Sequence, residues 1–232
     1  YSYVPFGEDA QYMLASAKVN QQECLFLVLL KDQGVTISKR NAMDETYPLY
    51  QVTLNNYKVS SEDLIGEMGE GTSILNEMKE LGRLLICAEM VGCSEEILNR
   101  TVEYAKQRIQ FDQSISKFQA IKHMAADMFL LLESSKAALD YATAIFHSNR
   151  NEEFPKSTAL LKSYVSEAGN TITGMAIQMH GGIGYTWESD VHLFFKRTRR
   201  SAVMLGDARY HKENLFQHIL EKSDEMKAVK SY

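Results

Sequence analysis

The sequence predicts an α+β fold, in which a partial antiparallel β domain over residues 1–66 precedes a bundle of long helices over residues 67–232. Two patterns predict this division. Apolar runs of strand length and alternating apolar residues dominate the first part, whereas apolar residues recur every three or four positions through most of the second. Hydrophobic residues make up 45% of the 232-residue chain, which is enough to fill a core.

Strands are expected in the first part. Residues 24–30 (CLFLVLL) form a fully apolar run typical of a buried strand, and residues 34–37 (GVTI) form a shorter strand after a turn. Residues 50–60 (YQVTLNNYKVS) alternate apolar and polar side chains around an Asn-Asn pair, which predicts a β-hairpin. Residues 1–66 are enough for only a few strands, so we expect that they form half of a sheet domain whose other half is missing.

Helices are expected after the glycine-rich residues 66–71. The first two and longest each carry one apolar stripe, and the third begins at Pro155, a favourable residue for a first turn. Long helices joined by short loops predict antiparallel packing in a bundle. The expected helices cover residues 72–107, 117–146, 155–179, 189–204 and 207–222.

Composition excludes several classes of function. A formal net charge of −5 lacks the basic excess of a nucleic-acid-binding protein, and no apolar run has the length of a membrane span. Cys24, Cys87 and Cys93 are odd in number and lack CxxC spacing, which is typical of a reduced, cytoplasmic protein. The chain begins with Tyr1 rather than Met, so we expect a fragment or a processed chain.

A glycine cluster lies within residues 177–190 (IQMHGGIGYTWESD). It lacks the GxGxxG pattern and a surrounding βαβ unit, which disfavours a Rossmann-type nucleotide site. Gly181 or Gly182 is expected to end the third helix in a left-handed conformation. That role leaves unexplained three larger side chains in the same turn: Gln178, His180 and Tyr185.

Three other patterns allow more than one interpretation. Arg108 and Phe111, between the two longest helices, are either surface and loop residues or ligand contacts. Residues 194–200 (FFKRTRR) predict a solvated basic helix face, with an anion contact as the alternative. His211 and His218 lie seven residues apart, but two ligands make a poor metal site, so no metal is predicted.

Three segments, taken in order, resemble the acyl-CoA dehydrogenase family of flavoproteins. The similarity covers nearly the whole chain and corresponds to the latter half of the family's middle β domain, followed by its C-terminal four-helix domain. It implies that an N-terminal helical domain and the start of the β domain are missing. The segments are residues 43–71 (MDETYPLYQVTLNNYKVSSEDLIGEMGEG), 99–128 (NRTVEYAKQRIQFDQSISKFQAIKHMAADM) and 177–200 (IQMHGGIGYTWESDVHLFFKRTRR).

The resemblance implies FAD as cofactor. Arg108 matches the arginine of the family's R-x-x-F-G turn, which reaches the diphosphate of FAD in a neighbouring subunit, and a guanidinium fork suits phosphate oxygens. Asp112 departs from this motif, because glycine is usual there. Gln178 begins the Q-x-x-G-G segment that wraps the adenine end. The implied FAD contacts are Arg108, Phe111, Gln119, Gln178, Gly181 and Gly182.

The family reaction is α,β-dehydrogenation of an acyl-CoA thioester, in which a carboxylate removes the α-proton and FAD accepts a hydride. Most members carry the base at the position of Leu205, and others at the position of Gly82, directly before an arginine that matches Arg83 and lies near the thioester. Neither position has a carboxylate here. The candidate catalytic residue is Asp207, nearest the usual position, with Glu80 and Glu188 as alternatives.

The resemblance also implies partners: an acyl-CoA substrate, an electron-transferring flavoprotein as acceptor, and self-association as a dimer or tetramer. The variant LGDA…YH near Leu205 resembles members described for bulky or branched acyl-CoAs, including steroid side chains. An alternative hypothesis is a non-catalytic subunit whose paralogue supplies the base. A plain helical interaction module is disfavoured by the density of the flavin motifs.

Overall fold

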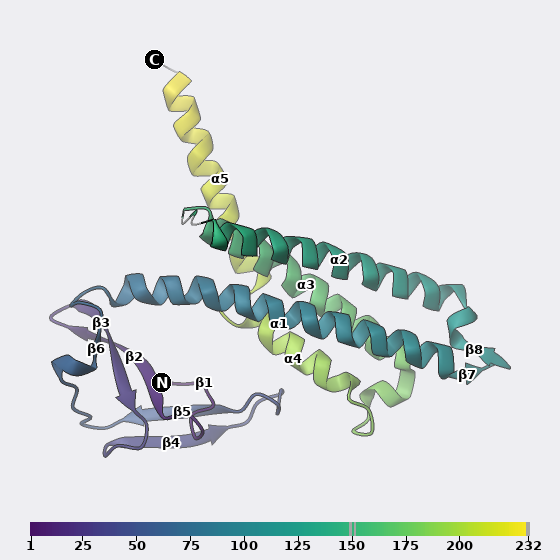
Figure 1. Cartoon of the computed structure of the whole chain (residues 1–232), viewed down its shortest axis with the longest axis horizontal. Coiled ribbons are helices and arrows are strands. Elements are labelled where there is room, and N and C mark those ends of the chain that lie inside the picture. Colours follow the sequence, from purple (N-terminus) through teal and green to yellow (C-terminus); the bar gives the residue numbers. More distant parts are fainter. Residues whose placement is uncertain (149, 151, 231–232) are drawn as a thin grey trace. The chain divides into compact units, whose positions relative to one another are not determined.

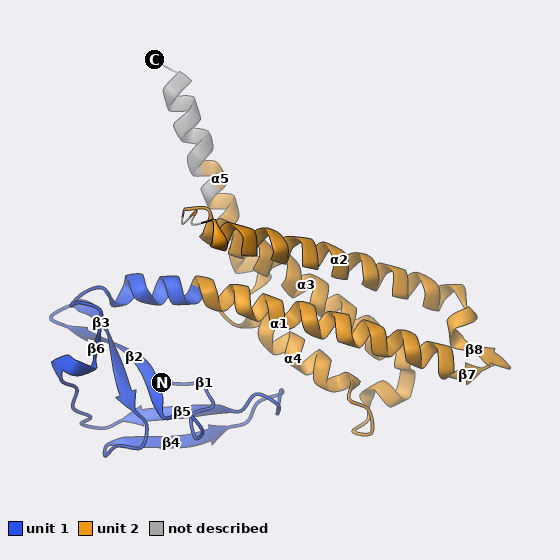
Figure 2. Ribbon diagram, viewed as in Figure 1, with its two compact units in different colours: residues 1–79 blue, residues 80–232 orange. Residues whose placement is uncertain are grey.

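A computed structural model shows strands in the first part of the chain and helices in the rest (Figure 1). The structure describes residues 1–148, 150 and 152–230, with the backbone alone for residue 218 and for residues 221–230. The chain divides into two compact units, residues 1–79 and residues 80–232 (Figure 2). The first unit thus includes the first turns of a helix, and the domain boundary expected between residues 66 and 67 stays a prediction.

Unit 1 contains two small antiparallel sheets, with strand orders β1-β5-β4 and β2-β3-β6. Asn20 and Gln21 both have positive φ angles, 48° and 67°, which is the backbone of a tight hairpin turn between β2 and β3. The strands are β1 (Val4–Pro5), β2 (Tyr12–Val19), β3 (Gln22–Leu29), β4 (Val35–Arg40), β5 (Leu49–Leu54) and β6 (Leu64–Ile65). Their buried core consists of Met13, Ala15, Val28, Leu30 and Val52.

The hairpin expected over residues 50–60 is wrong. Strand β5 ends at Leu54 and pairs with β4, in a register that sets Val35 opposite Leu54. Beyond Asn56 the chain leaves the sheet, and the Tyr57 hydroxyl accepts a hydrogen bond from the backbone N–H of Leu29 at 3.1 Å. A returning strand has no free edge, because β1 and β4 already flank β5.

The α+β fold class and all five expected helices are confirmed. Pro155 lies in the first turn of the third helix, as expected. The helices are α1 (Gly71–Gln107), α2 (Gln119–His147), α3 (Phe154–His180), α4 (Val191–Val203) and α5 (Ala208–Lys230). A two-stranded hairpin, β7 (Ile109–Gln110) and β8 (Gln113–Ser114), joins α1 to α2 and was not expected from the sequence.

Helix α3 is the central helix of unit 2, because it packs against α2, α4 and α5 (Figure 1). Small side chains let its neighbours approach. A Cβ built at Gly169 would lie 3.0 Å from Cγ2 of Thr198 on α4, so glycine permits this close packing. The apolar core of this unit includes Met90, Ile97, Met128, Leu161 and Ile172.

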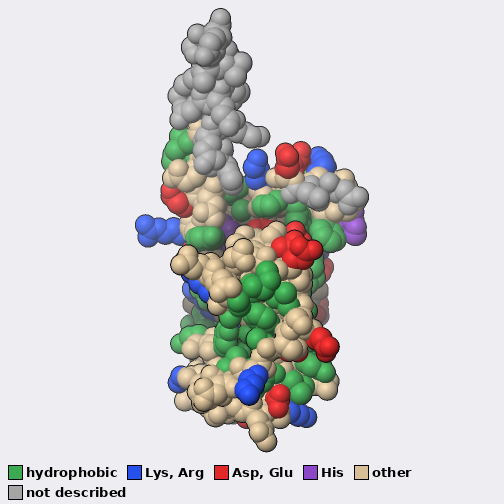
Figure 3. Space-filling view, turned by 90° about the vertical axis from the view of Figure 1, so that its left-hand side faces the viewer, with side chains coloured by type: hydrophobic (Ala, Val, Ile, Leu, Met, Phe, Trp, Pro, Cys, Tyr) green, Lys and Arg blue, Asp and Glu red, His purple; other side chains and the backbone are tan. Residues whose placement is uncertain are grey.

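Large hydrophobic side chains are exposed in both units. Figure 3 shows hydrophobic side chains gathered in the middle of the viewed face, with charged ones around them. Surfaces of this kind are typical of contacts with other chains. In the described part of the chain, no helix is both long and apolar enough to cross a membrane. The most exposed large hydrophobic residues include Tyr3, Phe111, Leu130, Tyr185, Trp187 and Val203.

Candidate functional site

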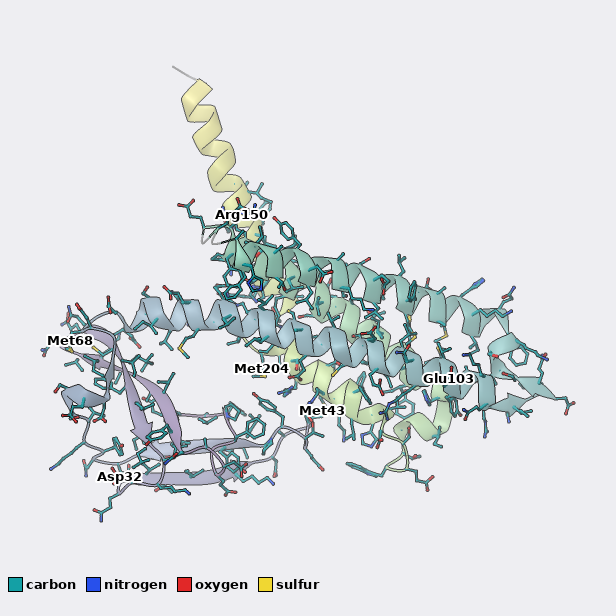
Figure 4. All side chains as sticks on the ribbon, in the orientation of Figure 1. Asp32, Met43, Met68, Glu103, Arg150 and Met204 are labelled. Carbon is teal, nitrogen blue, oxygen red and sulfur yellow. The ribbon has the colours of Figure 1, made fainter. Side chains whose placement is uncertain are left out.

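The segments that resemble the FAD motifs meet at one end of the helical unit. Tyr104, in the last turn of α1, stacks on His180, the last residue of α3, with ring centroids 4.3 Å apart and 20° between the ring planes. The Tyr104 hydroxyl also donates to the carbonyl of His180 at 3.3 Å. Arg108 follows one turn later, and Glu103 marks this end of α1 in Figure 4. The two motifs, 70 residues apart in sequence, are therefore joined by one contact.

The glycine cluster ends α3 at this place. Gly181 caps the helix with φ 62°, so the helix-ending role is confirmed for Gly181. A Cβ at Gly181 or Gly182 would meet nothing within 4 Å, whereas a Cβ at Gly184 would lie 2.9 Å from the carbonyl oxygen of Ile177. Gly184 is thus required by the fold of the turn, while the backbone of Gly181 and Gly182 is open to a ligand.

The β7–β8 turn explains the departure at Asp112. Phe111 and Asp112 both have left-handed backbone angles, φ 55° and φ 61°. Glycine suits such a position best, but aspartate tolerates it better than most residues. The Phe111 ring is 86% exposed, and the Ser114 hydroxyl donates to the carbonyl of Ala105 at 2.8 Å, which fixes the turn on α1.

The N-terminus of α2 adds donors that suit an anion. Helix α2 begins at Gln119, and its N-cap residue Phe118 offers no side-chain hydrogen bond to the first backbone N–H groups. Free N–H groups at a helix N-terminus favour phosphate, as does the exposed guanidinium of Arg108. The residues that the resemblance implies as FAD contacts are all exposed: Arg108, Phe111, Gln119, Gln178, Gly181 and Gly182.

The basic run on α4 is not the solvated face that the sequence predicts. The Arg200 side chain is only 10% exposed and lies 2.7 Å from Glu89 on α1. Arg197 also lies near Glu89, at 3.7 Å. The Lys196 ammonium lies over the Trp187 ring, 4.3 Å from its centroid. Much of this charge therefore binds α4 to its neighbours.

Gly82 and Leu205, the two positions that the resemblance assigns to the family's base, face each other. A Cβ built at Gly82 on α1 would lie 2.8 Å from Cδ1 of Leu205. Leu205 lies in the turn between α4 and α5, next to Met204 in Figure 4, and has a left-handed φ of 56°. One leucine side chain thus fills the space beside Gly82, and no carboxylate occupies either position.

The three candidate bases lie in different surroundings. Asp207 is exposed, and its carboxylate accepts a hydrogen bond from the backbone N–H of Tyr210 at 2.8 Å, so it caps α5. Glu80 uses one oxygen for an ion pair with Arg83 and the other to accept from the Thr158 hydroxyl. Glu188 is exposed in the loop before α4. Both Asp207 and Glu80 therefore have structural partners.

Arg83 and His211 both bind the carbonyl oxygen of Leu205. Arg83 Nε donates to it at 3.1 Å, and His211 Nε2 lies at the same distance. Because a carbonyl only accepts, Nε2 of His211 carries the proton. The His211 ring is buried, its Nδ1 has no partner among the described residues, and burial lowers the pKa of His211 below its usual value.

Lys162, a buried residue of α3, binds this turn and was not among the site residues expected from the sequence. Its ammonium is fully buried and donates to the carbonyls of Ala202 and Gly206 and to the Ser166 hydroxyl. Burial lowers the pKa of Lys162 to about 8. The small and apolar residues around it in α3, including Ala159 and Val165, were a signal that this helix face is buried.

Metal binding finds no support in the described side chains, since no group of three or more His, Cys, Asp or Glu residues is arranged to hold an ion there. His211, one of the two histidines considered as ligands, is engaged with the backbone of Leu205. The side chain of His218, the other one, lies outside the described residues.

Comparison with known proteins identifies the family. Residues 69–220 match the family model described as the acyl-CoA dehydrogenase C-terminal domain. The chain therefore belongs to the acyl-CoA dehydrogenase family. It also superposes on acyl-CoA dehydrogenase from Bacillus anthracis, solved in complex with FAD, with a TM-score of 0.91 and 21% identity over 97% of this chain and 42% of that one.

Curated relatives are similar over part of their length. Acyl-CoA dehydrogenase IpdE2 of Mycolicibacterium smegmatis is 38% identical over 57% of this chain and 40% of its own. The caffeyl-CoA reductase-Etf complex subunit CarC of Acetobacterium woodii is 30% identical over 85% of this chain and 52% of its own. The short-chain specific acyl-CoA dehydrogenase of Sus scrofa is 30% identical over 84% and 48%. The chain thus spans about half the length of these relatives, or less.

Proposed function

We propose that this chain is the C-terminal part of a flavoprotein that catalyses FAD-dependent α,β-dehydrogenation of an acyl-CoA thioester. The observation that carries the proposal is the contact between Tyr104 and His180, which brings the Arg108 turn and the Gly181–Gly182 backbone to one end of the helices. A guanidinium, a helix N-terminus and open glycine backbone then lie where a diphosphate and an adenosine can bind.

Each residue has a distinct part in this proposal. Arg108 holds the diphosphate, Phe111 and Gln119 contact the flavin, and the backbone of Gly182 lies against the adenosine. Arg83 lies near the thioester, where its guanidinium orients the acyl group. FAD supplies the acceptor for the hydride that leaves the β-carbon. Asp207 is the proposed base of this chain, and it acts only if its carboxylate leaves the N-terminus of α5.

Partners follow from the same proposal. The name of the CarC relative, a subunit of a reductase-Etf complex, supports an electron-transferring flavoprotein as electron acceptor. The exposed Phe111, Tyr185 and Trp187 support self-association as a dimer or tetramer, because large apolar side chains of this kind are usually covered in an assembly. The FAD contacts then serve the cofactor of a neighbouring subunit.

The test uses the protein encoded by the full reading frame, purified with FAD. We expect a flavin absorption spectrum that bleaches when the right acyl-CoA is added under anaerobic conditions, since the reduced flavin loses its long-wavelength bands. A panel of straight-chain, branched and steroid acyl-CoAs identifies the substrate class. Absence of a flavin spectrum after saturation with FAD would overturn the proposal.

The contact between Gly82 and Leu205 favours a second candidate, a non-catalytic subunit of a hetero-oligomer. With an apolar pair at both base positions, the chain keeps its FAD contacts while a paralogue supplies the carboxylate. We expect an inactive protein that gains activity when it is purified together with that paralogue. An active homo-oligomer would contradict this second candidate and favour Asp207 as the base.

A further inference from the structure

Lys162 is a buried cation whose hydrogen bonds all go to uncharged acceptors. Its Nζ donates to the carbonyl of Ala202 at 2.8 Å, to that of Gly206 at 3.1 Å and to the Ser166 hydroxyl at 3.1 Å. These bonds use all three N–H donors of an ammonium group. Burying a charge costs several kcal/mol even when it is well satisfied, so the position of this lysine calls for a role besides stability.

The two carbonyls that Lys162 holds enclose the Leu205 turn. Ala202 lies in the last turn of α4, where carbonyl oxygens have no partner within the helix, and Gly206 lies just before α5. The carbonyl of Leu205, between them, is held by Arg83 and His211. Three basic side chains from α1, α3 and α5 therefore bind three carbonyls of one turn.

Leu205 needs this support because its backbone is strained. A left-handed φ of 56° is unfavourable for leucine by roughly 1 kcal/mol or more, and such a residue persists only where its surroundings fix it. Gly206, with φ 101°, continues the same unusual path. Since a peptide group is planar, fixing the carbonyls of Leu205 and Gly206 also fixes the direction of the N–H groups that follow them.

We propose that Lys162 is a positioning residue, which together with Arg83 and His211 clamps the turn from Ala202 to Gly206 and so sets the place of residue 205. The role of position 205 as the base position of the family rests on the proposed function. The clamp itself is a property of the fold, so it is tested without FAD and without activity.

The charged and titratable groups around Lys162 come from three elements. Cys87 and Arg83 face it from α1, Asp207 from the turn and His211 from α5. Burial is the main cause of its lowered pKa, and the nearby Arg83 guanidinium acts in the same direction. When the turn opens and water reaches Lys162, its pKa returns toward the usual lysine value. Between about pH 8 and that value, opening is therefore coupled to protonation of Lys162, so a higher pH disfavours the open state.

Amide hydrogen exchange of the full-length protein tests the clamp. The reporters are the backbone amides of Met204 and His211, which donate to Arg200 and Asp207 on either side of the turn. In Lys162→Met we expect these two amides to exchange about tenfold faster, because two carbonyl hydrogen bonds are lost. Amides in the middle of α1 should change little. Lys156→Met, in the first turn of α3, is the matched control and should leave both reporters unchanged.

A pH profile separates the ammonium from the volume of the side chain. In the wild type, protection of the two reporter amides should rise by roughly tenfold or more between pH 7 and pH 9.5, after correction for intrinsic exchange. This rise should vanish in Lys162→Met. If that variant does not fold, Lys162→Gln serves the same comparison, with an amide in place of the ammonium. Equal protection and equal pH profiles in variant and wild type would overturn the clamp, whatever the result for FAD.

Discussion

Cδ1 of Leu205 lies 2.8 Å from the point that a Cβ on Gly82 would occupy. The resemblance assigns the family's catalytic base to one or other of these positions, and in this chain the Leu205 side chain fills the space beside Gly82. A side chain at position 82 therefore requires the Leu205 side chain to shift, so the residues at the two positions are sterically coupled.

A double-mutant cycle measures this coupling. Gly82→Ala gains about 1 kcal/mol of helix propensity but overlaps Leu205, which costs about 1–3 kcal/mol. We expect a net loss of stability in the wild type and a gain of about 1 kcal/mol in the Leu205→Ala background, measured by urea unfolding. Additive effects of the two substitutions would contradict the contact.

The alkaline pH dependence of stability should reveal Lys162. Its folded pKa of about 8 lies below the usual 10.5, so its contribution of about 3 kcal/mol is full above pH 10.5 and is lost as the pH falls through 8. Cys87 acts in the opposite sense. Burial raises the pKa of its thiol from 9.0 to about 12, so that its contribution is full below pH 9 and is lost as the pH rises toward 12.

Because the two contributions oppose each other, the wild type should change little between pH 8 and pH 10, and Lys162→Met should lose stability steeply. The free energy of unfolding in urea at several pH values checks this difference. Parallel curves for the two proteins would show that Lys162 titrates normally.

Two glycines in α1 should respond in opposite ways to alanine. A Cβ at Gly71 would lie 2.8 Å from the backbone carbonyl group of Glu23 in unit 1, whereas a Cβ at Gly92 meets nothing within 4 Å. We expect Gly71→Ala to destabilise by about 1–3 kcal/mol, because backbone cannot yield easily, and Gly92→Ala to stabilise by about 1 kcal/mol. The melting temperatures of the two variants should fall on either side of the wild type.

Tyr104→Phe should loosen the end of the helices at which FAD is proposed to bind. It keeps the stack on His180 but removes the hydroxyl hydrogen bond, at a cost of about 1 kcal/mol. FAD should bind a few-fold more weakly, as measured by flavin fluorescence. Tyr141→Phe on α2, where the side chain is half-exposed, is the control. If FAD binds equally weakly to both variants, the contact between Tyr104 and His180 has no specific part in FAD binding.

The positions of the long helices α1, α2 and α3 followed closely from the sequence, because each of them buries an apolar stripe that the 3.6-residue period records. The β7–β8 hairpin was missed because strands of two residues carry no period. The 50–60 hairpin was wrong because strand pairing depends on distant residues. Strands β1 and β4 pair with both edges of β5, so no edge is left for a returning strand after Asn56.

The site was predictable only in part. Spacing alone did not decide whether Arg108 and the glycine cluster contact a ligand, and the resemblance to the family supplied their roles. The stack of Tyr104 on His180 joins helices far apart in sequence, so no local pattern indicates it. Lys162 was missed because a lysine within a helical stripe is normally assigned to the solvent face, and only tertiary packing reveals that it is buried.

The central claim, that these residues form part of an FAD site, is tested most directly by an FAD titration of the full-length protein and its Arg108→Ala variant. Lys106→Ala, an exposed neighbour paired with Glu103, controls for loss of positive charge. We predict tight binding in the wild type and in Lys106→Ala, and at least tenfold weaker binding in Arg108→Ala, since a charge-assisted bidentate bond to the diphosphate is lost. Equal FAD affinity in all three proteins would contradict the account.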